Sequence, residues 1–391
     1  MLNTQFSPWP SFTEEESSAI QKVLMSNKVN YWTGDEGRLF EKEFGAFTGC
    51  KYAIALANGT VALDLALIGL GIKNGDEVIV TSRTFLASVS SIVNSGATPI
   101  FADIDENSQN VTSETIKTVI TQNTKAIICV HLAGFPCEMD EIMILAKEYN
   151  CYVIEDCAQA HGAKYKGKSV GSIGHVAAWS FCQDKIMTTG GEGGMVTTND
   201  EELWKQMWAY KDHGKSWDAV YNKKHPDGFR WLHESFGTNW RLTEIQSAIG
   251  RIQLTRMKEW SKARKINSDL IHKTCESLEC LRPVTVPSHI EHANYKYYVF
   301  IRSEMLKPGW DRDRIVAEII ERNVPCYQGT CSEVYLEKAF DDTNFRPEKR
   351  LQVARELGET SLMFLVHPTL TNAEIQRTCR AIVDVISLAS Y

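Results

Sequence analysis

One lysine, Lys185, stands in the run Trp179-Ser180-Phe181-Cys182-Gln183-Asp184-Lys185-Ile186-Met187-Thr188-Thr189-Gly190-Gly191-Glu192-Gly193-Gly194. It follows Asp156 by 29 residues, and Asp156 comes directly after the run Tyr152-Val153-Ile154-Glu155. A cofactor that acts as an electron sink needs such a pair. An amine forms a Schiff base with its aldehyde, and a carboxylate keeps its pyridine nitrogen protonated. We therefore expect pyridoxal 5'-phosphate (PLP) chemistry, against the alternative that Lys185 is a solvated surface lysine.

The composition limits the class of protein. A chain of 391 residues exceeds what one hydrophobic core usually serves, so we expect a large domain and a smaller one. A net charge of −7 argues against a nucleic-acid-binding protein. No apolar run reaches the roughly 20 residues of a membrane span, and the first residues do not resemble a signal peptide. We expect a cytoplasmic protein that binds neither membrane nor nucleic acid.

The cysteines indicate a reducing compartment and no metal site. There are 11 of them, without a Cys-x-x-Cys pair, so we interpret them as small buried side chains. Cys275 and Cys280 are five residues apart, as are Cys326 and Cys331, but neither pair has histidines at zinc-ligand spacing.

Residues 1–250 alternate between strand-like and helix-like patterns, which predicts a mostly parallel sheet covered on both faces. After Gly250 a long amphipathic helix pattern (251–278) begins, and we expect residues 251–391 to form a smaller α+β domain. The strands predicted for the first part are Glu77–Thr81, Thr98–Ala102, Ala126–Val130 and Cys151–Ile154. The helices predicted there are 11–24, 60–70, 87–94, 113–121 and 139–149. Those predicted after the long one are 312–323 and 371–389.

Ligands of parallel sheets bind beyond the carboxyl ends of the strands. Asp103, His131 and Asp156 each come at or just after such a strand end, so we expect each to face that crevice. Asp156 is expected to be half-buried, and its alternative role is a salt bridge to an arginine.

Further residues fit a bound pyridine ring and its phosphate. Asn58-Gly59-Thr60 opens a predicted helix, whose free amides bind anions, although the same triplet is also a common helix cap. Ser180 is a candidate for a second phosphate hydroxyl or an ordinary strand serine. Phe85 follows a strand end and can stack on a ring, or belong to the core. Gln159 is close enough to Asp156 to reach the phenolic oxygen of the ring.

Several motifs occur together and in order along nearly the whole chain, and with them the chain resembles the sugar aminotransferases of the DegT/DnrJ/EryC1/StrS family. That family has the fold-type-I, aspartate-aminotransferase-like PLP architecture. The resemblance implies an α/β large domain with a mostly parallel seven-stranded sheet. The motifs are Tyr31–Gly34, Ala57–Thr60, Gly96–Asp105, His131–Pro136, Glu155–Ala163, Ser180–Gly194, Asp212–Gly214 and Gly237–Thr243.

The resemblance also implies residue roles. Lys185 is the Schiff-base lysine, Asp156 the partner of the pyridine nitrogen, and Gln159 the contact of the phenolic oxygen. Gly59, Thr60 and Ser180 bind the phosphate, and Phe85 stacks on the ring. Asn239 reaches the phosphate of a neighbouring subunit, which implies a homodimer with shared active sites. Trp32, Thr33, His213, Arg230 and His367 are the expected substrate contacts.

The implied reaction moves the amino group of L-glutamate to a keto-sugar. The segments 217–231 and 328–335, together with Trp240 in place of the usual tyrosine, are distinctive. They resemble the subgroup that acts on 8-oxo-3,8-dideoxy-manno-octulosonate, an acidic sugar of lipopolysaccharide. For its carboxylate, Arg230 and Arg241 are candidates. The alternatives are an aminotransferase of a nucleotide-linked 3- or 4-keto-6-deoxy sugar, a PLP-dependent dehydratase, a regulator and a purely structural protein. Lys185 disfavours the dehydratase, because that branch carries a histidine there.

Overall fold

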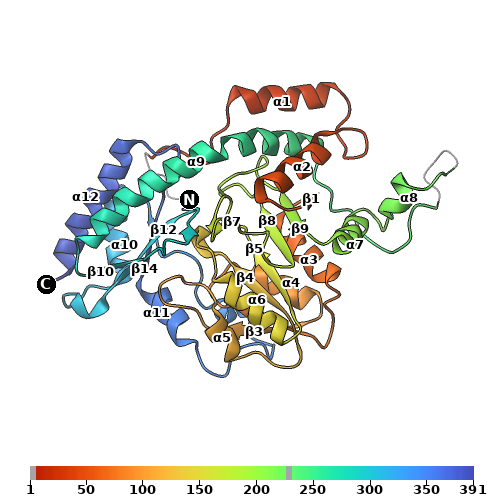
Figure 1. Ribbon diagram of the computed structural model, residues 1–391. Coiled ribbons are helices and arrows are strands. Elements are labelled where there is room, and N and C mark those ends of the chain that lie inside the picture. Colours follow the sequence, from red (N-terminus) through yellow and green to blue (C-terminus); the bar gives the residue numbers. More distant parts are fainter. Residues whose placement is uncertain (1–5, 226–230) are drawn as a thin grey trace.

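The computed structural model describes residues 6–225 and 231–391, and a seven-stranded sheet forms its centre (Figure 1). The strand order is β1-β9-β8-β5-β4-β2-β3. The four pairings from β3 to β8 are parallel, and the pairings of β9 with β8 and β1 are antiparallel. The predicted, mostly parallel seven-stranded sheet is therefore confirmed. The strands are β1 (Tyr52–Leu56), β2 (Glu77–Thr81), β3 (Thr98–Ala102), β4 (Thr124–Val130), β5 (Tyr152–Asp156), β8 (Val176–Ser180) and β9 (Gly194–Thr198).

Helices cover both faces of this sheet (Figure 1). On β2, Val78 and Val80 pack in one core cluster with the side chains of α3, whereas Ile79 between them packs on the opposite face with α6. Each fully buried side chain of this size stabilises the fold by about 1.5–3 kcal/mol. The covering helices are α2 (Glu36–Thr48), α3 (Gly59–Gly69), α4 (Ala87–Asn94), α5 (Ser113–Lys117), α6 (Met139–Glu148) and α7 (Glu201–Lys211).

A second, antiparallel sheet lies at the other side of the molecule, with strand order β10-β12-β14-β13 (Figure 1). Its apolar side chains share a core cluster with α10, α12 and the C-terminal half of α9. The strands are β10 (Leu281–Pro283), β12 (Tyr297–Ile301), β13 (Cys326–Tyr327) and β14 (Ser361–Phe364), and the helices are α9 (Glu244–Glu276), α10 (Arg312–Glu321), α11 (Gln352–Thr360) and α12 (Asn372–Ala389).

The remaining elements are short or peripheral. Helix α1 (Glu14–Met25) packs against α9. A small sheet of order β11-β6-β7 pairs the segment before β12 with the segment that follows β5. None of the helices that the structure describes is long and apolar enough to cross a membrane. The elements not yet named are β6 (Lys164–Tyr165), β7 (Lys168–Ser169), β11 (Ile290–Glu291), α8 (Trp217–Tyr221) and the 3₁₀ helices η1 (Leu132–Gly134), η2 (Ser303–Met305), η3 (Val334–Leu336) and η4 (Lys338–Phe340).

The long helix α9 begins earlier than the sequence pattern predicted. It starts at Glu244, capped by Thr243, whose side chain and that of Gln246 satisfy each other's backbone N–H groups. The helix thus runs without a break through Gly250, the position at which we placed the domain boundary. The division into residues 1–250 and 251–391 stays a prediction.

Asp103 does not face the crevice, contrary to our expectation. Its carboxylate accepts hydrogen bonds from the backbone N–H groups of Val353 (3.0 Å) and Ala354 (2.9 Å), at the start of α11. Helix α11 has no side-chain cap of its own. Because the first amides of a helix lack partners within it, a carboxylate from the end of β3 stabilises this end. Asp103 therefore connects residues about 250 positions apart.

Replacing this remote cap is expected to lower stability. Asp103→Ala should reduce the free energy of unfolding by about 1 kcal/mol, because two helix amides lose their acceptor. Asp103→Asn keeps one acceptor oxygen and should lose less. Thermal and urea unfolding of the three proteins measure the difference, and a stability of Asp103→Ala equal to that of the wild type would contradict this role.

Candidate active site

The carboxylate of Asp156 is held in place at the end of the central strand β5. It is 6% exposed, more deeply buried than we predicted. One oxygen accepts a hydrogen bond from Ser88 Oγ at 2.8 Å, and the other accepts one from the amide of Ala158 at 3.1 Å. Among the described residues no lysine or arginine pairs with Asp156, so the alternative role in a salt bridge finds no support. The geometry leaves this negative charge available to a bound cation.

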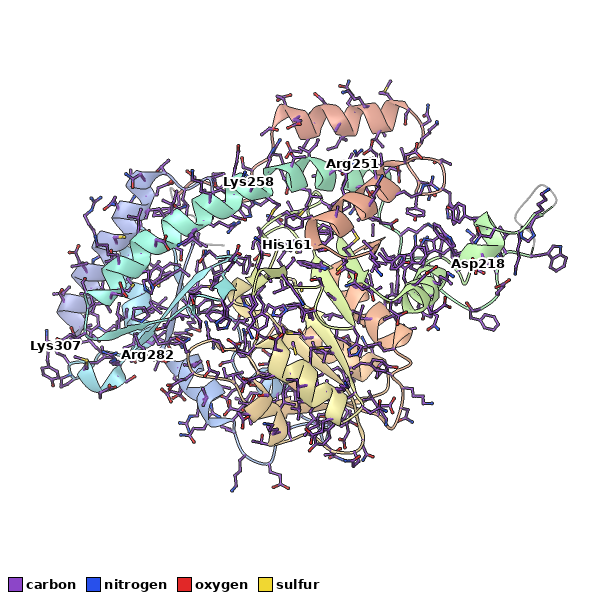
Figure 2. All side chains as sticks on the ribbon, in the orientation of Figure 1. His161, Asp218, Arg251, Lys258, Arg282 and Lys307 are labelled. Carbon is purple, nitrogen blue, oxygen red and sulfur yellow. The ribbon has the colours of Figure 1, made fainter. Side chains whose placement is uncertain are left out.

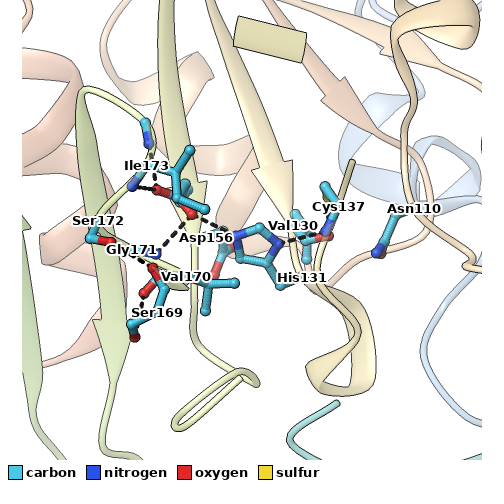
Figure 3. Close-up of polar contacts among 12 residues, drawn as sticks. Asn110, Val130, His131, Cys137, Asp156, Ser169, Val170, Gly171, Ser172 and Ile173 are labelled. Carbon is cyan, nitrogen blue, oxygen red and sulfur yellow. Dashed lines mark hydrogen bonds and ion pairs between the residues drawn. The ribbon is translucent and has the colours of Figure 1, made fainter. Parts of the chain in front are cut away.

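The neighbouring residue, Glu155, is fully buried, and because side chains alternate along a strand, its carboxylate points to the other face of β5. Its hydrogen-bond partners include His131, Gly171 and Ile173, which Figure 3 labels. Oε2 accepts hydrogen bonds from His131 Nε2 (3.0 Å) and the amide of Gly171 (2.8 Å). Oε1 accepts from the amides of Ile173 (2.9 Å) and Gly174 (2.6 Å). Burial opposes ionisation, but these donors outweigh it and lower the pKa of Glu155 below its ordinary 4.5.

His131 does not face the crevice with its side chain, which corrects a second expectation. Its ring is buried; Nδ1 accepts the amide N–H of Cys137 (3.0 Å), so Nε2 carries the proton donated to Glu155. Its backbone N–H donates to the carbonyl of Asp156 at 3.1 Å. The His131–Glu155 pair therefore supports the strand end that carries Asp156.

His131, Glu155 and the thiol of Cys157 lie close together, with one possible ligand atom of each within 4.8 Å of the others. Both carboxylate oxygens and both ring nitrogens already have hydrogen-bond partners. These groups are thus satisfied without a cation.

The start of α3 forms a cradle of free backbone amides against β8. The side chain of Asn58 accepts the amide of Val61 (3.0 Å), so the amides of Gly59 and Thr60 remain for a ligand. A Cβ on Gly59 would lie 2.6 Å from Ser180 Cβ, so only glycine fits there. Helix N-termini with free amides bind phosphate groups. The structure thus brings together the three residues that we expected to bind a phosphate.

Lys185 lies where three distant segments meet. Its side chain is 17% exposed, and Nζ lies 3.9 Å from the carboxylate of Asp184 and 5.3 Å from the ring centroid of Tyr295. The indole N–H of Trp9 donates to the carbonyl of Lys185 at 2.8 Å. We did not predict Trp9 or Tyr295, because these contacts span 176 and more than 100 residues and leave no local pattern.

Phe85 and Gln159 have the exposure and contacts that a flat ligand needs. Phe85 is 71% exposed, so the structure contradicts the alternative that it belongs to the core. Its loop leads into α4, whose Ser88 contacts Asp156. Gln159 Oε1 accepts the amide N–H of Ala133 at 2.8 Å, which directs the side-chain amide and leaves its N–H groups for a ligand oxygen.

Residues 216–225 and 231–240 form an arm that projects from the body (Figure 1) and contains the short helix α8, on which Figure 2 labels Asp218. The arm returns at Trp240, whose carbonyl accepts the amide of Ala57 at 2.9 Å, next to the cradle. Asn239 is exposed there.

The expected substrate residues lie in different places. Trp32 packs against Trp208 at the base of the arm, and Thr33 and His213 are exposed. His367 is buried and its ring stacks on Trp9 (6.0 Å), which connects it to Lys185. Arg230 lies outside the described residues. No contact between described residues joins Trp32, Thr33 or His213 to Lys185.

Arg241 is not a free cation. Its Nη1 lies 2.6 Å from Oδ1 of the buried Asp212, which also accepts from Lys215 at 3.2 Å. A substrate carboxylate would therefore compete with Asp212 for this guanidinium.

The Glu155 network makes stability depend on pH. Because the folded-state pKa lies below 4.5, its contribution is fully present above that value and is lost as the pH falls through the folded-state pKa. We expect Glu155→Gln to cost about 2–3 kcal/mol at pH 7, since a donor group then faces backbone donors. The difference in the free energy of unfolding between Glu155→Gln and the wild type should become smaller below pH 4.5.

Denaturant unfolding between pH 7 and pH 4 measures this difference. Glu114→Gln, which removes an exposed charge paired with Lys117, is the matched control and should change little at any pH. A difference for Glu155→Gln that is small or independent of pH would refute the assignment.

The chain matches known proteins over almost its entire length. The family model of the DegT/DnrJ/EryC1/StrS aminotransferase family matches residues 10–383. The chain is 35% identical to GDP-perosamine synthase from Escherichia coli O157:H7, over 97% of each chain. Among solved structures, an aminotransferase from Psychrobacter cryohalolentis is 61% identical, with a TM-score of 0.96 over 98% of this chain and 99% of that one.

The cofactor follows from the same comparisons. Spr1654 from Streptococcus pneumoniae, solved in its PLP form, is 25% identical, with a TM-score of 0.86 over 99% of each chain. Asp156, the cradle at Gly59 and Lys185 fit that group, because they supply a carboxylate, free helix amides and an amine. The chain belongs to the DegT/DnrJ/EryC1/StrS aminotransferase family, and it is a PLP-dependent aminotransferase.

Proposed function

We propose that this aminotransferase moves the amino group of L-glutamate to a keto-sugar used in bacterial surface polysaccharide. The observation that carries the proposal is the arrangement of Lys185, Asp156 and the Gly59 cradle at one edge of the sheet. The names of relatives support the sugar: they include GDP-perosamine synthase and a dTDP-3-amino-3,6-dideoxy-alpha-D-galactopyranose transaminase, which is 31% identical.

Each residue at this edge has a task in the proposed reaction. PLP, when bound, withdraws electrons from the substrate carbon that carries the nitrogen. Asp156 would keep the pyridine nitrogen protonated, because its carboxylate is buried and has no cationic partner among the described residues. Lys185 Nζ carries the proton to and from that substrate carbon. Gln159 donates to the phenolic oxygen, and Phe85 covers one face of the ring.

A homodimer with shared active sites is part of the proposal. The arm carries two exposed aromatic side chains, Trp231 (78% exposed) and Phe236 (98% exposed). Solvent-exposed aromatic groups on a projecting segment are typical of an interface. Asn239, at the end of the arm, is exposed, and the next residue, Trp240, is hydrogen-bonded to Ala57 beside the cradle. In the proposed dimer, Asn239 contacts the phosphate bound by the partner subunit.

Two sugars compete as the acceptor. The relatives named for GDP-, dTDP- and UDP-linked sugars favour a nucleotide-linked keto-sugar. The distinctive segments 217–231 and 328–335 favour 8-oxo-3,8-dideoxy-manno-octulosonate, which carries a carboxylate and no nucleotide. Incubation with glutamate and a panel of both kinds of keto-sugar, with mass spectrometry of the products, separates the two. An amine in the product also excludes a dehydratase.

Removing the amine of Lys185 should abolish the reaction. Lys185→Ala is expected to lower turnover by at least 1000-fold, because it removes the amine that carries the proton in the proposed reaction. The exposed lysine Lys258, replaced by alanine, is the matched control and should leave turnover unchanged. Release of 2-oxoglutarate from glutamate is the measurement. Turnover of Lys185→Ala near that of the wild type would refute the assignment.

A further inference from the structure

Two cations other than Lys185 lie at the junction of α9, the segment before β12 and the active-site lysine. Arg264 Nη1 donates to the carbonyl of Tyr295 at 3.2 Å. The ammonium of Lys296 lies 4.8 Å from the ring centroid of Tyr295, and that of Lys185 lies 5.3 Å from the same centroid. Three positively charged side chains, those of Lys185, Arg264 and Lys296, therefore lie around Tyr295.

Arg264 is a buried guanidinium that forms no ion pair with the residues that the structure describes. The residue is 1% exposed, and its Nε and Nη2 have no hydrogen-bond partner among them. Its planar group lies 5.0 Å from the ring of Trp9, whose indole contacts Lys185. Burial lowers the pKa of Arg264 to about 9. A buried charge is costly unless an anion or several hydrogen bonds compensate it.

Lys296 is a second partly buried cation, and a ligand can reach it from a cleft. Its side chain is half-buried and lines a cleft of about 1030 Å³ between α9 and residues 282–302. Burial lowers its pKa to about 8, and the charges of Arg264 and Lys185 add to this effect, while Asp184 opposes it.

Asp184 does not compensate all of these charges. Its carboxylate already accepts the hydroxyl of Tyr295 and lies 3.9 Å from Lys185 Nζ. His161, near the centre of the molecule (Figure 2), and His367 are the nearby histidines. Burial keeps both neutral, with pKa values of about 3, and neighbouring cations contribute in each case. Around Tyr295, Asp184 is thus the carboxylate that, among the described residues, acts on Lys296, and it faces the three cations Lys185, Arg264 and Lys296.

We propose that Lys296, with Arg264 behind it, forms a subsite for a carboxylate group of the substrate. This inference rests on the proposed function, since glutamate and an acidic keto-sugar both supply such a group. An anion at this position would compensate the excess positive charge around Tyr295, whose ring both Lys296 and Lys185 approach. The ammonium of Lys296 makes the contact, and Arg264 acts through the positive potential that it adds.

The test compares holoenzymes with lysine or methionine at position 296. Lys296→Met keeps most of the length of the side chain and removes its charge, Lys296→Arg restores the charge, and Lys258→Met, an exposed position of α9 outside the cleft, is the control. The bound cofactor's absorption shows that each variant is folded and loaded. Glutarate, a dicarboxylate that cannot donate an amine, is titrated by the change in that absorption.

We expect Lys296→Met to weaken glutarate binding by roughly 10- to 100-fold, the usual effect of losing a hydrogen bond to a charged group. Lys296→Arg should recover most of the affinity, and Lys258→Met should bind glutarate as the wild type does. In Lys296→Met, glutarate binding can stay unchanged while the KM of an acidic keto-sugar rises and that of a neutral keto-sugar does not. That result would support the subsite and show that it binds the carboxylate of the sugar. Unchanged glutarate binding together with unchanged KM values for glutamate and the acidic keto-sugar would overturn the inference.

The proposed function is judged separately. Wild-type transamination of a keto-sugar by glutamate is measured first, and its absence would refute the proposed function whatever the variants do. An active wild type with an unaffected Lys296→Met variant would refute only the subsite.

Discussion

Two consecutive carboxylates at the end of β5 face opposite sides of the strand, and the site depends on the difference between them. Glu155 receives hydrogen bonds from His131 and three backbone amides, so its charge is fully compensated within the protein. Asp156 receives only one hydroxyl and one amide and has no cationic partner among the described residues. Side chains alternate along a strand, so one buried anion holds the strand end while its neighbour meets the ligand.

This constraint explains why the candidate site lies at the carboxyl edge of the sheet. Ser180 and Asp156 end neighbouring parallel strands, and the cradle at Gly59 closes on Ser180 with no room for a Cβ. The second half of the site comes from elsewhere: Trp9 near the N-terminus and Tyr295 before β12 both contact the Lys185 region. The lysine therefore sits where both sheets and the N-terminal segment converge, which also concentrates positive charge around it.

The sequence predicted most of the strands of the large sheet, and it indicated the residues that we propose to hold the cofactor, for physical reasons. Strands such as Glu77–Thr81 are covered on both faces and therefore appear as continuous apolar runs between turn signals. Lys185 and Asp156 were recognisable because the chemistry of the cofactor demands an amine and a carboxylate. Residues whose role depends on long-range contacts were not recognisable: the pattern of Asp103 does not differ from that of Asp156, yet Asp103 caps α11. Arg264 likewise looks like any other charged residue of a long amphipathic helix until its burial is known.

The central claim is that the cofactor is bound covalently through Lys185, and one measurement tests it directly. The purified holoenzyme is treated with borohydride, which fixes a Schiff base as a stable amine, and is then digested and mapped by mass spectrometry. The account predicts a pyridoxyl adduct on the peptide that contains Lys185. An adduct on another lysine, or none on any peptide of a coloured preparation, would contradict it.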